Sequence, residues 1–263
     1  MRVSEIMKAI ESVAPLRLQE EYDNAGLQVG FPDSPVRRVI VSLDITEEVV
    51  REAIRRDAQM IVSHHPLIFR PLRQVSNLSW QQRCVVLALQ HGIALYSAHT
   101  NLDNARGGVN HEIARRLSLK DLSFLRPVPG EDAGSGLLGL LETPLEPQAF
   151  LSLLRKEFRL QVLAHSDTSR KLISKVALCG GAGAFLIPDA IRSGADCFLT
   201  GEIRYHDFFE NEGMLLCSLG HYESEQYTSD LLISLLRTAF PELEVLSSEC
   251  ITNPVRYNTN TGE

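Results

Sequence analysis

Short apolar runs rich in β-branched residues recur along the chain, and stretches with helical spacing of apolar residues separate them. Such runs predict buried strands. Residues 45–56, with Thr46 as N-cap, residues 80–90, and residues 1–16, with Ser4 as N-cap, have the spacing of amphipathic helices. The alternation predicts an α/β protein with a parallel or mixed sheet. The predicted strands are 39–43, 60–62, 93–96, 176–178, 197–199 and 214–217.

The two halves of the chain show a weak internal similarity. A shift of 137 residues places 41–65 on 178–202, with four identities among the 25 aligned pairs. Duplication explains this match, and so does a shared α/β pattern without a common origin. Residues 127–136 contain Pro, Gly, Ser and acidic side chains typical of a surface loop. We therefore expect one α/β lobe at 1–126 and a second at 127–263.

Composition narrows the class of protein. The chain has 263 residues, of which 44% are hydrophobic, and this is enough for one large domain or two packed lobes. A net charge of -7, with no Lys/Arg run longer than two, makes nonspecific nucleic-acid binding unlikely. Five cysteines without a C-x-x-C pair favour a reducing, cytoplasmic setting. The apolar runs are far shorter than the roughly 20 residues of a membrane helix.

Two adjacent histidines, His64 and His65, directly follow the predicted strand 60–62. The carboxyl end of a strand is where open α/β sheets build their sites. Neighbouring residues on an extended strand point to opposite sides, so the pair suits two neighbouring ions better than one, provided that the strand is ending. The alternative is a pair of loop histidines with structural hydrogen bonds.

Two further strands are each followed by a histidine and, four residues later, a carboxylate: His99 with Asp103, and His221 with Glu225. His99 could be a metal ligand, an acid/base or an orienting group, and Asp103 a ligand or the cap of a helix near residue 109. On a helix, His221 and Glu225 would share one face and could share one metal. The alternative is an ordinary helix start enriched in acidic residues.

Glu202 ends another predicted strand and aligns with His65 in the internal comparison, so we expect it to face the same cavity. The glycine-rich residues 180–183 predict a tight strand-to-helix turn and lack the dinucleotide fingerprint. Together the clusters offer imidazoles and carboxylates, a mixed set that suits Zn, Fe, Mn or Ni. It argues against a calcium cage or an all-thiolate zinc site.

These motifs, in this order, resemble the dinuclear-metal proteins of the GTP cyclohydrolase I type 2 family, also called the NGG-interacting-factor or NIF-three-like family. The resemblance covers nearly the whole chain. Its motifs are YDNAGLQVG at 22–30, SLD at 42–44, SHHPLIF at 63–69, HTNLD at 99–103, GGAG at 180–183, TGE at 200–202 and GHYESE at 220–225.

The resemblance implies two divalent metal ions held by His64, His65, Asp103, His221 and Glu225, with Glu225 bridging the two. It also implies two intertwined α/β lobes of related topology and a toroidal homohexamer. The short loop at 127–136 has no room for the large insertion that some members carry, which predicts the compact form.

Two such ions would make a hydroxide available near neutral pH, so the predicted function is metal-dependent hydrolysis. His99 or Glu202 would move the proton as the catalytic group. Purine-ring opening, amide hydrolysis and phosphoester hydrolysis all fit, with a small molecule such as a nucleotide as substrate. The alternative is a non-enzymatic protein that binds or delivers metal, or a regulatory protein, because fold and metals do not determine a reaction.

Overall fold

The structure is a computed structural model that describes residues 1–258, and these residues divide by their contacts into two compact units. Unit 1 comprises Met1–Ala105 and Tyr227–Thr252, and unit 2 comprises Arg106–Gln226 and residues 253–258. This division differs from the one at residues 126 and 127 predicted from the sequence. Residue 127 is the last of a strand that pairs within unit 2, and a late helix and strand return to unit 1.

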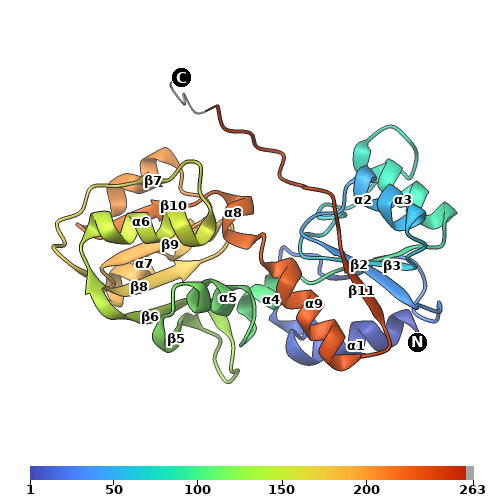
Figure 1. Cartoon of the computed structure of the whole chain (residues 1–263), viewed down its shortest axis with the longest axis horizontal. Helices are drawn as coiled ribbons and strands as arrows, with labels where there is room; N and C mark the ends of the chain where they lie inside the picture. Colours follow the sequence, from blue (N-terminus) through green and yellow to red (C-terminus); the bar gives the residue numbers. More distant parts are fainter. Residues whose placement is uncertain (259–263) are drawn as a thin grey trace. The chain divides into compact units, whose positions relative to one another are not determined.

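Unit 1 is built on a five-stranded sheet of order β1-β4-β3-β2-β11. Four of its strands run parallel, and β1 joins the edge antiparallel to β4. Figure 1 shows α2 and α3 on one side of this sheet and α1 and α9 on the other. The strands are β1 (Gly26–Val29), β2 (Arg38–Ser42), β3 (Met60–Ser63), β4 (Ala94–Ser97) and β11 (Glu244–Ser247). The helices are α1 (Val3–Val13), η1 (Leu16–Leu18), α2 (Glu47–Arg55), α3 (Trp80–Gln90), α4 (Thr100–Asn104) and α9 (Thr228–Ala239).

The start of each predicted helix in unit 1 depends on its cap. Thr46 caps α2 as predicted, because its side chain accepts a hydrogen bond from the Val49 amide at 3.3 Å. The prediction of Ser4 as the cap of α1 is wrong. Arg2 holds the N-cap position, and the Glu5 carboxylate accepts a hydrogen bond from its amide. Ser4 already lies inside the helix, and its amide donates to the Pro32 carbonyl.

The core of unit 1 follows from strand alternation. Ile40, Ile61 and Leu95 lie on three adjacent strands and pack with the apolar stripe of α2, which includes Val49 and Ala53. Each fully buried side chain of this size contributes about 1.5–3 kcal/mol. The sheet is therefore a rigid base, and its carboxyl edge can hold polar side chains at fixed positions.

Unit 2 is built on a six-stranded sheet of order β5-β6-β8-β9-β10-β7, in which β8, β9 and β10 are parallel and the others antiparallel. Helix α7 packs on one face through residues such as Ile187 and Ala190. The strands are β5 (Lys120–Pro127), β6 (Gly134–Leu145), β7 (Ala164–His165), β8 (Ile173–Cys179), β9 (Cys197–Thr200) and β10 (Leu215–Ser218). The helices are α5 (Val109–Arg116), α6 (Pro147–Phe158), η2 (Gly183–Leu186), α7 (Ile187–Arg192), η3 (Tyr205–Glu210) and α8 (His221–Glu225).

The mixed α/β architecture predicted from the sequence is confirmed. The six predicted runs correspond to β2, β3, β4, β8, β9 and β10. The predicted loop at 127–136 is shorter, since β5 and β6 form an antiparallel pair that leaves a connection at 128–133. Among the described residues, none of the helices has the length and apolar character that a bilayer crossing requires.

Candidate metal centre

Three histidines gather where β3 and β4 end in unit 1. His64, His65 and His99 each offer a ring nitrogen, and these atoms lie within 4.8 Å of one another. The ring centroids of His64 and His65 are 4.8 Å apart, and His99 lies 5.3 and 5.5 Å from them. Parallel strands end at one edge of a sheet, which explains why residues 34 positions apart in the sequence meet here.

The backbone after β3 explains how adjacent histidines face one place. The amides of His64 and His65 both donate to the Leu43 carbonyl, at 3.1 and 3.0 Å. The Ser63 hydroxyl donates to the His65 carbonyl at 2.8 Å. These bonds bend the chain out of the extended geometry in which neighbouring side chains would diverge. The condition set by the sequence, that the strand is ending, is met.

Each of the paired imidazoles is held by its Nδ1 atom. His64 Nδ1 donates to the Ala98 carbonyl at 2.8 Å, and His65 Nδ1 donates to Asp44 Oδ1 at 2.7 Å. Because both partners are acceptors, Nδ1 carries a proton in each ring, and Nε2 is the atom that can bind a metal. This arrangement is typical of metal-binding histidines.

His99 is held in the same way, by Asp23. His99 Nδ1 donates to Asp23 Oδ1 at 2.7 Å, and the Thr100 amide donates to Oδ2 at 3.1 Å. Burial raises the pKa of Asp23, but the hydrogen bond and charge of His99, with the bonds from Thr100 and Asn24, outweigh it and lower the pKa to about 2. The Asp23 side chain is 0% exposed and ionised at neutral pH. A buried carboxylate behind an imidazole stabilises the protonated ring.

Asp103 lies on α4, with Oδ1 3.6 Å from His64 Nε2. The alternative role of a helix cap is wrong, because Gly108 holds the N-cap position of the next helix, α5. Asp103 therefore lies beside His64 and adds a carboxylate oxygen to the potential donor atoms of unit 1.

The sequence alone pointed to no role for Asp23 or Asp44. Both lie within motifs that carry the family resemblance, and Asp44 follows the end of β2. Burial raises the pKa of Asp44, but hydrogen bonds from His65 and Thr252 outweigh it, so that the pKa lies below its usual value. A carboxylate directly after a strand was the available signal, but its histidine partner 21 residues away was not visible in the sequence.

Unit 2 brings together the other predicted donors. His221 begins α8, where its Nδ1 donates to Glu202 Oε1 at 2.8 Å and its Nε2 lies 3.2 Å from Glu225 Oε2. The Glu225 side chain is 4% exposed, and the His221 side chain 38%. Glu202 therefore acts on the ring of His221 as Asp44 acts on His65.

The glycine turn after β8 makes room for Glu225. Gly181 has φ +57°, and a side chain there would collide with the Glu225 carboxylate. The Gly181 amide donates to Ser224 Oγ at 3.1 Å, and its carbonyl accepts from the Glu202 amide at 3.0 Å. The turn predicted from the sequence is present, and it helps to position the carboxylates of Glu202 and Glu225.

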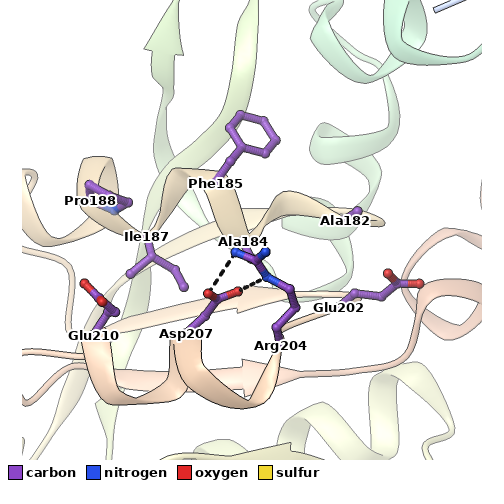
Figure 2. Close-up of a pocket in the computed structure, with 9 residues that line it drawn as sticks. All are labelled: Ala182, Ala184, Phe185, Ile187, Pro188, Glu202, Arg204, Asp207 and Glu210. Atoms are coloured by element: carbon purple, nitrogen blue, oxygen red, sulfur yellow. Dashed lines mark hydrogen bonds and ion pairs between the residues drawn. The ribbon is translucent and has the colours of Figure 1, made fainter. Parts of the chain in front are cut away.

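A cavity of about 440 Å³ lies beside Glu202 in unit 2 (Figure 2). Its apolar wall comes from the segment that follows the glycine turn, and its polar wall from the segment that follows β9. The Arg204 guanidinium is paired with Asp207 through two bonds of 3.0 and 3.1 Å, while Glu202 lies at one end of the cavity and Glu210 at the other. The lining residues are Ala182, Ala184, Phe185, Ile187, Pro188, Glu202, Arg204, Asp207 and Glu210.

The donor chemistry fits a divalent transition ion. Unit 1 supplies imidazoles that are anchored through Nδ1 together with one carboxylate, and unit 2 supplies one imidazole with a buried carboxylate. Zn, Fe, Mn and Ni accept such a mixture of nitrogen and oxygen ligands. Anchored Nδ1 atoms supply the outer hydrogen bonds that orient the ligands.

Comparison with known proteins gave matches over nearly the whole chain. A model of the Duf34/NIF3 (NGG1p interacting factor 3) family matches residues 1–254. A GTP cyclohydrolase 1 type 2 homolog from Streptococcus pneumoniae is 32% identical, covering 98% of this chain and all of that protein. The NIF3-like protein 1 of Drosophila melanogaster is also 32% identical, covering 97% of this chain and 88% of its own length.

Solved structures agree with these matches. The Staphylococcus aureus protein SA1388 superposes with a TM-score of 0.90 and 26% identity, covering 98% of this chain and 99% of that one. Reduced HcgD from Methanocaldococcus jannaschii has a TM-score of 0.80 and 27% identity, covering 95% and 98% of the two chains. The likeness thus extends through both units.

Proposed function

Because the chain belongs to the NIF3 (NGG1p interacting factor 3) family, we propose that it is a metal-dependent hydrolase with a centre of two divalent ions. The ligands are His64, His65, Asp103, His221 and Glu225. Each unit carries part of this donor set, and the function requires both parts. The relatives named GTP cyclohydrolase 1 type 2 homolog support the hydrolase assignment.

The observation that carries the proposal is the shared anchoring of the imidazoles. His64, His65 and His221 each bond an acceptor through Nδ1, so Nε2 is the atom of each ring that would bind a metal. Glu225, which is almost fully buried, would be the ligand that the two ions share.

Two bound ions would supply Lewis acidity and a hydroxide near neutral pH. Five ligands, one of them shared, leave coordination positions for water and substrate, which favours catalysis over a closed structural site.

His99 is the group that we assign to proton transfer. Asp23 fixes its Nδ1 proton and stabilises the imidazolium, so Nε2 can accept a proton and later donate it. Glu202 is the second candidate. It lines the cavity but also holds the ring of His221, so we assign it to orienting that ligand and to contacting the substrate.

The cavity beside Glu202 is the proposed place of the substrate. Its volume of about 440 Å³ suits a small organic molecule. Three carboxylates and one guanidinium line it, and that guanidinium is already paired with Asp207. This charge favours a ring that donates N–H hydrogen bonds over a phosphate group. Cyclic amides and amidines, including nucleotide bases, are therefore the first class to test, ahead of phosphoesters.

The decisive experiment measures hydrolysis by the metal-loaded protein and by the same protein after chelation. The panel contains GTP, cyclic amides and phosphodiesters, and we expect turnover that disappears with chelation and returns with metal. Stoichiometric metal without turnover on any compound would favour the alternative, a metal-binding, metal-delivery or regulatory protein. If the protein binds no metal under any condition, both the hydrolase proposal and the metal-binding alternative are contradicted.

We also propose a homohexamer in a reducing, cytoplasmic setting. The family resemblance supports the hexamer, and Tyr205 and Phe209 on η3 are 73% and 71% exposed, as suits a contact surface. All five cysteines lie within the described residues and are free thiols. Light scattering should give six times the chain mass of 29.3 kDa. A monomeric mass would contradict the assembly.

A further inference from the structure

We propose that residues 248–252, which follow β11, form a strap that positions the His65 imidazole through Thr252 and Asp44. The inference rests on the proposed function in one respect, that His65 binds a metal. All the contacts involved lie within unit 1. Thr252 is a positioning residue in this account, because it acts on the ligand through another side chain.

The strap is anchored to a buried carboxylate. Glu52 lies on α2 among apolar residues, with its side chain 1% exposed. Its oxygens accept from Arg56 Nη1 at 2.7 Å, from the Ser248 hydroxyl at 2.6 Å and from the Glu249 amide at 3.0 Å. A buried charge is costly unless such bonds satisfy it. Two of these three donors, Ser248 and Glu249, belong to the strap. The strap therefore satisfies the hydrogen bonds of a buried carboxylate that has no part in the proposed catalysis.

The beginning of the strap continues the sheet. The Ser248 amide donates to the Val41 carbonyl at 2.9 Å, extending the pairing of β11 with β2. The Cys250 amide then donates to Ser248 Oγ at 3.1 Å, and this turns the chain. Both ends of the turn are therefore fixed before the chain reaches Thr252.

The end of the strap reaches the partner of a proposed ligand. Thr252 Oγ1 donates to Asp44 Oδ2 at 2.5 Å, while His65 Nδ1 donates to Asp44 Oδ1 at 2.7 Å. Each oxygen of Asp44 thus has its own donor. The two hydrogen bonds fix the plane of the Asp44 carboxylate. The orientation of this plane in turn favours one rotation of the His65 ring about its Cβ–Cγ bond.

Removing the Thr252 hydroxyl should loosen the contacts from Thr252 through Asp44 to His65 without removing a metal ligand. Asp44 keeps its bond to His65 but gains freedom to rotate. Loss of a direct outer-sphere partner weakens metal binding by roughly 10- to 100-fold. Thr252 lies one step farther from the metal, so we expect a loss of about 3- to 10-fold.

The test uses the full-length Thr252→Val protein, which keeps the side-chain shape and loses the hydroxyl. Titration with Co²⁺, followed by visible absorption, should show affinity weakened by about 3- to 10-fold with a changed spectrum. In the metal-free protein, the ¹⁵N signals of His65 should show a smaller population with the proton on Nδ1. Thr252→Ser should restore both readouts.

The matched control is Thr238→Val. Thr238 is also a threonine of unit 1, but its hydroxyl donates to Ser234 within the same helix, so Co²⁺ affinity should stay at the wild-type value. An equal loss in both valine variants, or wild-type affinity and His65 signals in Thr252→Val, would overturn the proposal. If the wild-type protein binds no Co²⁺, the metal assignment fails, and the His65 signals of the metal-free protein still decide whether the strap orients the ring.

Discussion

The two units share a strand order but carry different side chains at the same edge. Strands β1-β4-β3-β2 of unit 1 correspond to β7-β10-β9-β8 of unit 2, with three parallel strands and one antiparallel edge strand in each. After the middle strand, unit 1 has His64 and His65 where unit 2 has Gly201 and Glu202. Topology therefore fixes where polar side chains gather, and the sequence at each strand end decides what they do.

Roles are exchanged between equivalent positions. His65 has a carboxylate behind it, and its equivalent, Glu202, is itself the carboxylate behind a histidine. His99 and His221 follow equivalent strands, yet Asp23, from the N-terminal segment, holds His99. Unit 1 recruits orienting groups from distant parts of its sequence, whereas unit 2 finds one at its own strand end. The comparison predicts which substitutions should disable each unit.

Removing one carboxylate from either unit should have the largest effect. Asp103→Ala in unit 1 and Glu225→Ala in unit 2 should each lose bound metal while the fold is kept, because the proposed centre needs ligands from both. Elemental analysis and circular dichroism, measured on the same samples, check this. Stoichiometric metal in either variant would mean that one unit suffices.

Asp23→Asn should strongly reduce turnover and leave the metal in place. The amide cannot stabilise an imidazolium, so kcat should fall by about 100-fold or more. Glu202→Gln, the corresponding change in unit 2, should instead weaken metal binding, since Glu202 orients a ligand. Parallel measurement of kcat and metal content distinguishes the two. If the two variants lose kcat and metal to the same extent, Asp23 and Glu202 do not have the different roles assigned to them.

Gly181→Ala tests the contrast between a glycine and an aspartate at equivalent positions, because Gly181 aligns with Asp44 in the internal comparison. The added methyl group should displace Glu225, and the positive φ should cost about 1–2 kcal/mol. We expect metal affinity to fall by about 10-fold. Gly194→Ala, also at positive φ but with open space around it, controls for backbone strain. Equal losses in both variants would remove the steric explanation.

Glu52 and its equivalent Asp189 should differ in their effect on stability. Glu52 is buried and bonded to the strap, while Asp189 pairs with the more exposed Arg126 and Arg192. Glu52→Gln should lower the free energy of unfolding by about 1–3 kcal/mol, and Asp189→Asn by less than about 1 kcal/mol. Urea unfolding of each variant measures these values.

The effect of Glu52 should also depend on pH. Burial raises the pKa of Glu52, but bonds from Ser248, Glu249 and Arg56 outweigh it and bring the pKa below the ordinary value of 4.5. A lowered pKa contributes stability that is present above pH 4.5 and is lost as the pH falls through the folded-state value. The difference between wild type and Glu52→Gln should therefore shrink at acid pH. A constant difference would contradict the ionised state of Glu52.

Six strand positions and the chemistry at their ends could be read from the sequence because both depend on local pattern, whereas β1, β5, β6, β7 and β11 were not predicted. Apolar runs predicted six strands, and the polar residues after them predicted where donors gather. The partners of these donors could not be predicted. Thr252 meets Asp44 across 208 positions, and Asp23 meets His99 across 76. Such pairs arise from tertiary packing, which no local periodicity encodes.

The start of α1 and the division of the chain into two units could not be predicted from the sequence either, because both depend on contacts between distant residues. Ser4 had the residue type of a cap, but the contact of its amide with Pro32 places it within the helix. The loop at 127–136 marked a real turn, yet the turn joins two strands of one sheet. The return of α9 and β11 to unit 1 is a long-range pairing with β2 that the loop could not reveal.

The Leu43 carbonyl, which accepts both the His64 and the His65 amides, ties two proposed ligands to the end of a strand that contains neither. A shift of the chain just after β2 should therefore displace the backbone of both His64 and His65. Lengthening or shortening the chain at residue 43 would move the carbonyl that both amides share, and β3 acts on the same pair through the Ser63 hydroxyl, which donates to the His65 carbonyl. The backbone positions of the two histidines thus depend on a carbonyl just beyond the end of a neighbouring strand.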